Sequence, residues 1–200
     1  KRRFYEECLR HGLPILPIHA TLSLGEVESL RVRVFDGDAA AYWNLLSRLP
    51  DRFVIKPSHG LQGRGVRFFR RQGGALSTWS GTSVAPIEFA ESMWSSARTP
   101  AAERSGELAD RFLLIQRAGS AHPEIEALTG SEVMQSVRIC TIVDEQSSAE
   151  ILFSFCKLVV GGNLIDNFEK GKTGNLLAYA AIDSGRIFRS IRNDLALGFG

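Results

Sequence analysis

The chain has 200 residues, of which 44% are hydrophobic and 23% are charged, and its formal net charge is +2. This length and composition predict one or two soluble globular domains with a real core. The small net charge argues against binding to nucleic acid or to a membrane surface. No apolar run approaches the ~20 residues that a membrane span needs, and no signal peptide opens the chain.

The three cysteines, Cys8, Cys140 and Cys156, are odd in number and lack the spacing of metal or redox motifs. This pattern favours reduced thiols and a cytosolic location. The chain begins at Lys1 rather than at a methionine and ends at Gly200. We therefore expect it to be a piece of a longer protein.

The first part of the chain, residues 1–52, is expected to be a helical lead-in. Residues 2–10 place apolar side chains four apart, which indicates a helix. Pro14 and Pro17 then favour an extended passage. A second helix is predicted from residue 38 to residue 48, because its first residue is an aspartate that can cap it.

Residues 53–69 carry the most informative pattern. A short apolar strand ends at Lys56, a turn containing Gly60, Gly63 and Gly65 follows, and a second strand comes after the turn. Glycines bend the backbone tightly and let N–H groups approach an anion without a Cβ in the way. A lysine at the mouth of such a turn suits a phosphate.

The order of these parts separates nucleotide-binding folds. A Walker A loop has its lysine after the glycines and opens a helix, and a Rossmann turn also opens a helix. Here Lys56 comes first and a strand follows, so the glycines cap a hairpin that could fold over a triphosphate. A surface hairpin with a solvated lysine is the alternative interpretation.

Residues 72–84 are rich in Gly, Ser and Thr and are predicted to be a loop. Residues 86–97 begin with a proline suited to a first helical turn and are predicted to be a helix. Residues 98–110 are small and charged and are expected to be a connection. The apolar face of the helix is expected to consist of Ile87, Ala90, Trp94 and Ala97.

The second half of the chain is predicted to be rich in strands. Residues 112–116 form a buried strand, and two hairpins follow. These hairpins pair residues 137–143 with 150–157 and residues 176–182 with 187–191. Helices mixed with antiparallel hairpins predict an α+β fold. We expect a smaller subdomain over residues 53–111 and a larger one over residues 112–200.

The strand at residues 112–116 breaks into a short polar linker. The backbone N–H and C=O groups of this linker could form hydrogen bonds with the edge of an adenine. The alternative is a core strand that leaves its sheet. Further on, strand alternation places Arg138 on the face opposite Val137 and Ile139. A phosphate or a substrate carboxylate would satisfy Arg138 through two hydrogen bonds. A structural acid or solvent could satisfy it equally.

Residues 155–175 are dense in Gly, Asn and Lys. Asn167 can donate to phosphate or ligate a metal, and Lys157, Lys170 and Lys172 could balance the charge of a triphosphate. A solvated loop is the alternative interpretation.

Taken in order, these segments resemble the ATP-grasp superfamily over about residues 50–190. The closest resemblance is to the sugar-transfer-associated ATP-grasp proteins, relatives of the α-L-glutamate ligases. Lys56 and the glycines after it are similar to the family's phosphate lysine and flexible glycine loop. Gln116 and His122-Pro123 resemble its adenine-binding linker and the element that follows. Asp183-Ser-Gly185 is similar to an Asp-x-x-Thr-Gly turn of the subgroup, one or two residues shorter.

The resemblance extends to Val137-Arg138 with Thr141, and to Asp166-Asn167-Phe168 ahead of two glycines. It implies two α+β subdomains that clasp ATP, and it implies the use of ATP and Mg²⁺. We expect this fold to be incomplete at the C-terminus. The resemblance also implies an ATP-dependent ligase that joins a small-molecule carboxylate to an amine through an acyl-phosphate. The subgroup suggests a place in the synthesis of cell-surface polysaccharides or peptide-like metabolites.

The resemblance also assigns roles to individual residues. Arg138, Asn167 and Lys157 are the expected catalytic residues, and Asn167 is also an expected metal ligand. The expected nucleotide-binding residues are Lys56, Ser58, Gly60, Gly63, Gly65, Gln116, Arg117, Ala118 and His122.

One departure from the family pattern concerns the metal. ATP-grasp enzymes hold two Mg²⁺ with an acidic residue and a late Glu-x-Asn, and nothing after residue 190 supplies that pattern. Either the natural chain continues, which we expect, or the protein is a non-catalytic nucleotide-binding module. A protein-kinase-like phosphotransferase is a third hypothesis, which is weakened because no His-Arg-Asp or Asp-Phe-Gly occurs.

Overall fold

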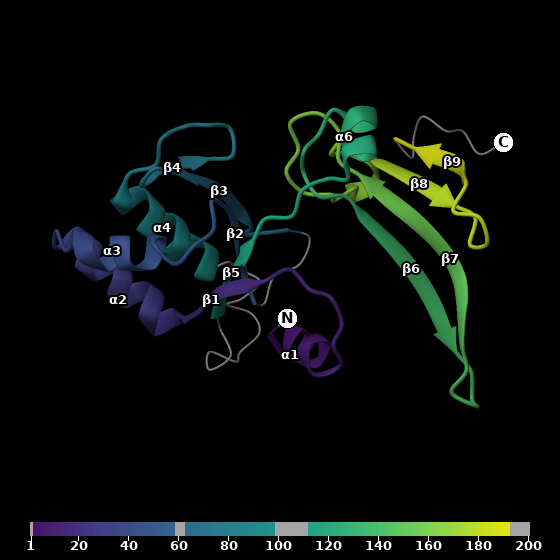
Figure 1. Cartoon of the computed structure of the whole chain (residues 1–200), viewed down its shortest axis with the longest axis horizontal. Helices are drawn as coiled ribbons and strands as arrows, with labels where there is room; N and C mark the ends of the chain where they lie inside the picture. The colour runs from purple at the N-terminus through teal and green to yellow at the C-terminus, as the bar shows by residue number, and fades with distance from the viewer. Residues whose placement is uncertain (1, 59–62, 99–111, 193–200) are drawn as a thin grey trace. The chain divides into compact units, whose positions relative to one another are not determined.

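A computed structural model describes residues 2–58, 63–98 and 112–192. The chain divides into two compact units, Lys1–Ala118 and Gly119–Gly200 (Figure 1). Within the described residues, each unit contains one antiparallel sheet. The protein is therefore mixed α+β, as the sequence predicts.

The sheet of the first unit has five strands in the order β1-β5-β2-β3-β4. In that order they span Ile18–Ser23, Phe112–Arg117, Arg52–Pro57, Arg67–Gln72 and Ala75–Thr78. Strands β2 and β3 pair in antiparallel fashion, with Phe53 opposite Phe69. The strands that flank the glycine-rich turn thus form the predicted hairpin.

Strand β5 belongs to the first unit, because it pairs with β1 on one side and with β2 on the other. It therefore lies inside the first sheet rather than at the start of a separate subdomain. Three successive side chains are fully buried, as a central strand covered on both faces requires. They are Leu113, Leu114 and Ile115.

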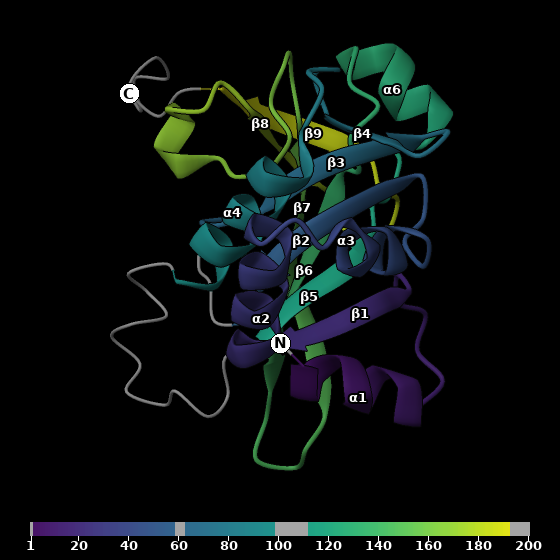
Figure 2. The same cartoon turned by 90° about the vertical axis from the view of Figure 1, so that its left-hand side faces the viewer.

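Three helices cover one face of this sheet (Figures 1 and 2). They are α2 (Leu24–Phe35), α3 (Ala39–Leu46) and α4 (Pro86–Ala97). The core between them and the sheet is aromatic: the ring of Phe89 lies 5.2 Å from that of Phe69 and 6.2 Å from that of Phe53. Helix α1 (Arg2–Arg10) lies at the other face of the sheet.

The buried face of α4 differs from the predicted one. Ala90 and Ala97 are buried as expected, but Ile87 is 45% exposed. Phe89 and Met93 are fully buried instead. These two large side chains remove more apolar surface from water than Ile87 would, so they set the orientation of the helix against the sheet.

Among the described residues of the first unit, three elements are absent from the sequence prediction: β1, α2 and β4. Strand β4 lies within residues 72–84, which were expected to be a loop, so that expectation is wrong there. Gly73 and Gly74 join β3 to β4 with φ of 53° and 88°. A Gly-Gly pair between two strand-like segments is a hairpin signal in the sequence, and it could have revealed β4.

Helix α2 starts with a capping box. The Ser23 hydroxyl accepts a hydrogen bond from the Glu26 N–H at 3.3 Å, and the Glu26 carboxylate accepts one from the Ser23 N–H at 2.7 Å. Ser23→Ala should therefore lower the free energy of unfolding by about 1 kcal/mol at neutral pH. Urea unfolding of both proteins measures this difference.

The capping box also predicts a pH dependence. Hydrogen bonds from the hydroxyl and the N–H of Ser23 hold the pKa of Glu26 below its usual value. Because the folded-state pKa is depressed, this stabilisation is present above the unfolded-state pKa of about 4.3 and is lost as the pH falls through the folded-state value. Glu26→Gln should flatten the stability curve in that acidic window, and an unchanged curve would contradict the capping box.

The second unit has a four-stranded sheet in the order β6-β7-β8-β9. The strands span Ser136–Val143, Ala149–Leu158, Leu176–Ala180 and Ile187–Ile191, so both predicted hairpins are confirmed. The unit also contains helix α6 (Pro123–Thr129) and the short 3-10 helix η2 (Glu169–Gly171). None of the helices in the described part of the chain has the length and apolar character for a membrane crossing.

Candidate functional site

Lys56 lies on β2, with its side chain on the face opposite the helical core. Phe53 and Ile55 are fully buried, and strand alternation turns Lys56 to the other side of the sheet. Its Nζ donates a hydrogen bond to the Tyr5 hydroxyl at 2.7 Å and lies 5.3 Å from the centroid of the Tyr5 ring. The predicted phosphate lysine is thus half-buried and held by a side chain of α1.

Gln116 lies on β5 on the same face, because it is the cross-strand partner of Val54. Its side chain is buried, and both the oxygen and the nitrogen of its amide have hydrogen-bond partners. The Tyr5 hydroxyl donates to Oε1 at 3.2 Å, and Nε2 donates to the Leu16 carbonyl at 2.6 Å. Lys56 and Gln116, two predicted nucleotide-binding residues, therefore belong to one network with Tyr5.

A basic group accompanies this network on the same face. Arg52 is two positions along β2 from Val54, and Arg70 is its cross-strand partner on β3. Their guanidinium carbons lie 5.6 Å and 4.5 Å from the ring centroid of Trp79. Sequence reasoning did not single out these residues, although the period-2 spacing of Arg52 and Lys56 was a usable signal. The face is positively charged and suits a polyphosphate.

The turn between β2 and β3 is described only in part. Gly63 and Gly65 each have φ of 73°, a left-handed conformation that favours glycine. Gly60 lies outside the described residues. Ser58 is buried, and its hydroxyl accepts a hydrogen bond from the Phe112 N–H at 3.0 Å. That hydroxyl joins β2 to β5, and its predicted contact with phosphate stays a prediction.

The last residue of β5 and the first residue after it both use their N–H groups within the first unit. The Arg117 N–H donates to the Pro17 carbonyl at 3.1 Å, and the Ala118 N–H donates to the Arg52 carbonyl at 3.0 Å. In this conformation those two donors already have acceptors. The predicted adenine contact therefore depends on other groups of the linker.

His122 is the N-cap of α6 in the second unit. Its Nδ1 accepts a hydrogen bond from the Glu124 N–H at 3.4 Å, and the side chain is exposed. The Pro123 that follows suits the first helical turn. This local role accounts for the His-Pro pair without a ligand, and the expected nucleotide contact of His122 stays a prediction.

Arg138 and Lys157 lie on the same face of the second sheet. Ser136 is the cross-strand partner of Lys157, and Arg138 follows two residues later on β6 opposite Phe155. Cross-strand partners share a face, and so do residues two apart on one strand. Arg138 is exposed, as its predicted contact with a phosphate or carboxylate requires.

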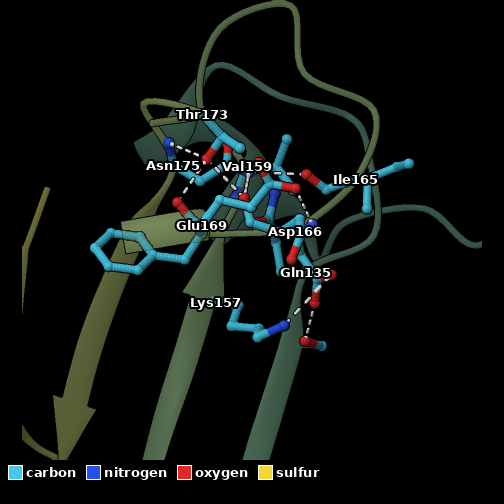
Figure 3. Close-up of polar contacts among 11 residues, drawn as sticks. Gln135, Lys157, Val159, Ile165, Asp166, Glu169, Thr173 and Asn175 are labelled. Carbon is cyan, nitrogen blue, oxygen red and sulfur yellow. Dashed lines mark hydrogen bonds and ion pairs between the residues drawn. The ribbon is translucent and has the colours of Figure 1, made fainter. Parts of the chain in front are cut away.

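Lys157 is paired with a carboxylate (Figure 3). Its Nζ lies 3.8 Å from Oδ1 of Asp166, and the side chain of Lys157 is 16% exposed. The Ser136 hydroxyl donates to the other carboxylate oxygen of Asp166. In this arrangement Asp166 holds the ammonium of Lys157 near the end of β7.

Asn167 is fixed by its neighbours. Its carbonyl accepts hydrogen bonds from the Thr173 hydroxyl at 2.6 Å and from Nδ2 of Asn175 at 2.8 Å. Its own Nδ2 donates to a Glu169 oxygen at 2.8 Å. Glu169 and Lys170 have φ of 45° and 57°, an uncommon conformation outside glycine. The segment after Asp166 is therefore an ordered turn rather than a freely solvated loop.

Two asparagines, Asn163 and Asn175, hold the loop between β7 and β8, and Figure 3 shows Asn175 among its partners. Asn175 is fully buried, and its Oδ1 accepts from the Val160 N–H at 3.2 Å and from Nδ2 of Asn163 at 2.9 Å. Its Nδ2 also reaches the Ile165 carbonyl at 2.8 Å. Sequence reasoning missed both residues. Their only signal was the density of asparagine and glycine in the segment.

The described residues fit a polyphosphate better than they fit a divalent metal. Basic side chains gather on one face of each sheet, whereas no group of three or more His, Cys, Asp or Glu among the described residues could hold a metal ion. Asp166 is engaged with Lys157 and Ser136, and Asn167 can offer one amide oxygen. The described residues therefore do not complete a Mg²⁺ site.

The chain belongs to the sugar-transfer-associated ATP-grasp family, whose model matches residues 1–196. The resemblance inferred from the motifs is confirmed and extends over the N-terminal segment as well. No curated protein and no solved structure matches the chain. Membership of the family indicates an ATP-dependent, ligase-like activity.

Proposed function

We propose that the protein is an ATP-dependent carboxylate–amine ligase that acts through an acyl-phosphate. The family match supports the use of ATP. The position of Lys56 carries the proposal: it lies near the end of β2, ahead of a glycine turn, on a sheet face that also bears Arg52 and Arg70. A compact ammonium beside a tight turn of glycines suits the phosphates of a nucleotide.

In the proposed reaction, an oxygen of the substrate carboxylate attacks the γ-phosphorus of ATP, and ADP leaves. The nitrogen of the amine then attacks the acyl carbon, the C–O bond to phosphate breaks, and the amine loses a proton. These steps require charge compensation and positioning more than covalent help from the protein. Lys56 and the glycine turn would hold the phosphates in this scheme.

The second unit would supply further charges. Lys157, kept in place by Asp166, would offset developing negative charge. Arg138 would bind the γ-phosphate or the substrate carboxylate through two hydrogen bonds, which its planar guanidinium allows. Asn167 would donate to a phosphate oxygen or offer its amide oxygen to a metal. Ligands beyond the described residues would be needed to complete a Mg²⁺ site.

The substrates would be a small carboxylate and an amine, and the family description points to a context of sugar transfer. The reaction would contribute to the synthesis of cell-surface polysaccharide. It would take place in the cytoplasm. A non-catalytic module that binds nucleotide without turnover is the alternative. The two differ in whether bound ATP is consumed.

Calorimetry with ATP and with NAD, both with Mg²⁺ present, tests the nucleotide. We expect ATP to bind and NAD not to bind, because the turn connects two strands rather than opening a helix. Phosphate release with and without candidate carboxylates then tests turnover. Binding of NAD alone would overturn the proposal, and ATP binding without phosphate release under any acceptor would favour the non-catalytic module.

A further inference from the structure

Tyr5 lies in a segment to which neither the motifs nor the glycine turn assign a role. It is carried by α1, on the sheet face opposite the helical core, and it contacts Lys56 from 51 residues away in the sequence. The contact has two parts. The Tyr5 hydroxyl accepts a hydrogen bond from Nζ at 2.7 Å, and the ammonium lies 5.3 Å from the ring centroid. Both parts attract a cation.

The direction of the hydrogen bonds is fixed by the neighbours of Tyr5. A tyrosine hydroxyl has a single proton, and here it goes to Oε1 of Gln116 at 3.2 Å. The amide of Gln116 keeps that orientation because its Nε2 donates to the Leu16 carbonyl at 2.6 Å. The oxygen of Tyr5 is therefore left to accept a hydrogen bond from Nζ of Lys56.

The arrangement leaves Lys56 able to bind an anion. An ammonium has three N–H donors, and Tyr5 takes one of them. A lysine side chain has many rotamers, so an unrestrained Lys56 would lose more freedom on meeting a phosphate than one already held. A neutral partner holds the ammonium without cancelling its charge, in contrast to the Asp166 carboxylate beside Lys157.

We propose that Tyr5 is a positioning residue that holds Lys56 for the phosphates of ATP, with Gln116 setting the orientation of the Tyr5 hydroxyl. Helix α1 is then part of the nucleotide site rather than a lead-in to it. This inference rests on the proposed function. If the Tyr5 hydroxyl instead occupied the place of a phosphate, its removal would strengthen ATP binding rather than weaken it.

The test is a double-mutant cycle on the full chain, with ATP and adenosine as calorimetric ligands. Tyr5→Phe keeps the ring and removes the hydroxyl, and it should weaken ATP binding about tenfold, because an unrestrained Lys56 loses its rotamer freedom only when it meets the phosphates. Adenosine affinity should not change, because adenosine carries no phosphate. In a Lys56→Ala background, Tyr5→Phe should have no further effect on ATP.

Tyr42→Phe is the matched control, since Tyr42 is buried in the helical core away from this face, and it should leave ATP affinity unchanged. Thermal melting checks that every variant folds. Equal ATP affinity for wild type and Tyr5→Phe would overturn the inference, as would tighter binding or an undiminished effect without Lys56. If the wild type itself bound no ATP, the proposed function would fail as well, and the two failures are thereby distinguished.

Discussion

Lys56→Ala should reduce ATP turnover by about 10²–10³-fold, because a preorganised charge at a phosphoryl group commonly contributes that much to catalysis. The fold should survive. Lys56 is the penultimate residue of β2, is half-buried, and lies on the face away from the core. Its removal therefore breaks the contact with Tyr5 and no packing between strand and helices. Initial rates of phosphate release and calorimetry with ATP measure the two effects.

Arg10→Ala is a suitable control for the loss of a positive charge. Arg10 is exposed and pairs with Glu7 on the surface of α1 at 2.9 Å. Its removal should change neither turnover nor ATP affinity, since exposed ion pairs contribute little. If Lys56→Ala bound ATP as tightly as the wild type, the surface-hairpin interpretation of the glycine turn would be correct.

Asn175→Ala should destabilise the second unit by about 3–5 kcal/mol. The side chain is fully buried and has four hydrogen-bond partners, and each partner left without a replacement inside the protein costs about 1–3 kcal/mol. The loop between β7 and β8 should open first, because Asn175 joins its two ends. This loss is comparable with the whole stability of a small unit.

Hydrogen exchange is the right measurement, because the three tryptophans all lie in the first unit and would report on the wrong part of the chain. Amides of residues 159–175 should exchange faster in the variant, while those of β2 and β5 should not change. Asn44→Ala provides the matched control, since Asn44 is exposed on α3. Unchanged exchange in residues 159–175 would contradict the scaffold role of Asn175.

The parts of the site that the sequence predicts are those whose residues are adjacent in the chain. Lys56 and its glycines form one continuous pattern, so both the hairpin and the face of the lysine follow from strand alternation. The link from Lys56 through Tyr5 to Gln116 does not follow from any such local pattern. Tyr5 and Gln116 are 111 residues apart, and only the order of strands in the sheet brings them together.

The role of a polar residue is harder to predict from the sequence than the role of a glycine in a turn. Ser58 and His122 each suit a ligand by composition, but in the structure one joins two strands and the other caps a helix. A hydroxyl or an imidazole satisfies a backbone N–H as readily as a phosphate does, so residue type alone cannot separate the two uses. For Asn175, burial revealed a structural role that its place in a polar segment concealed.

The position of β5 between β1 and β2 has a consequence for how the protein is made. On a ribosome, β2, β3 and β4 emerge together and can pair locally, whereas β1 emerges first and has no partner until β5 follows. Gln116 and Leu16, which meet at this junction, are 100 residues apart. The closing step of the first unit is thus non-local and slow, and a nascent chain halted before residue 112 would expose β1 as an unpaired edge open to other chains.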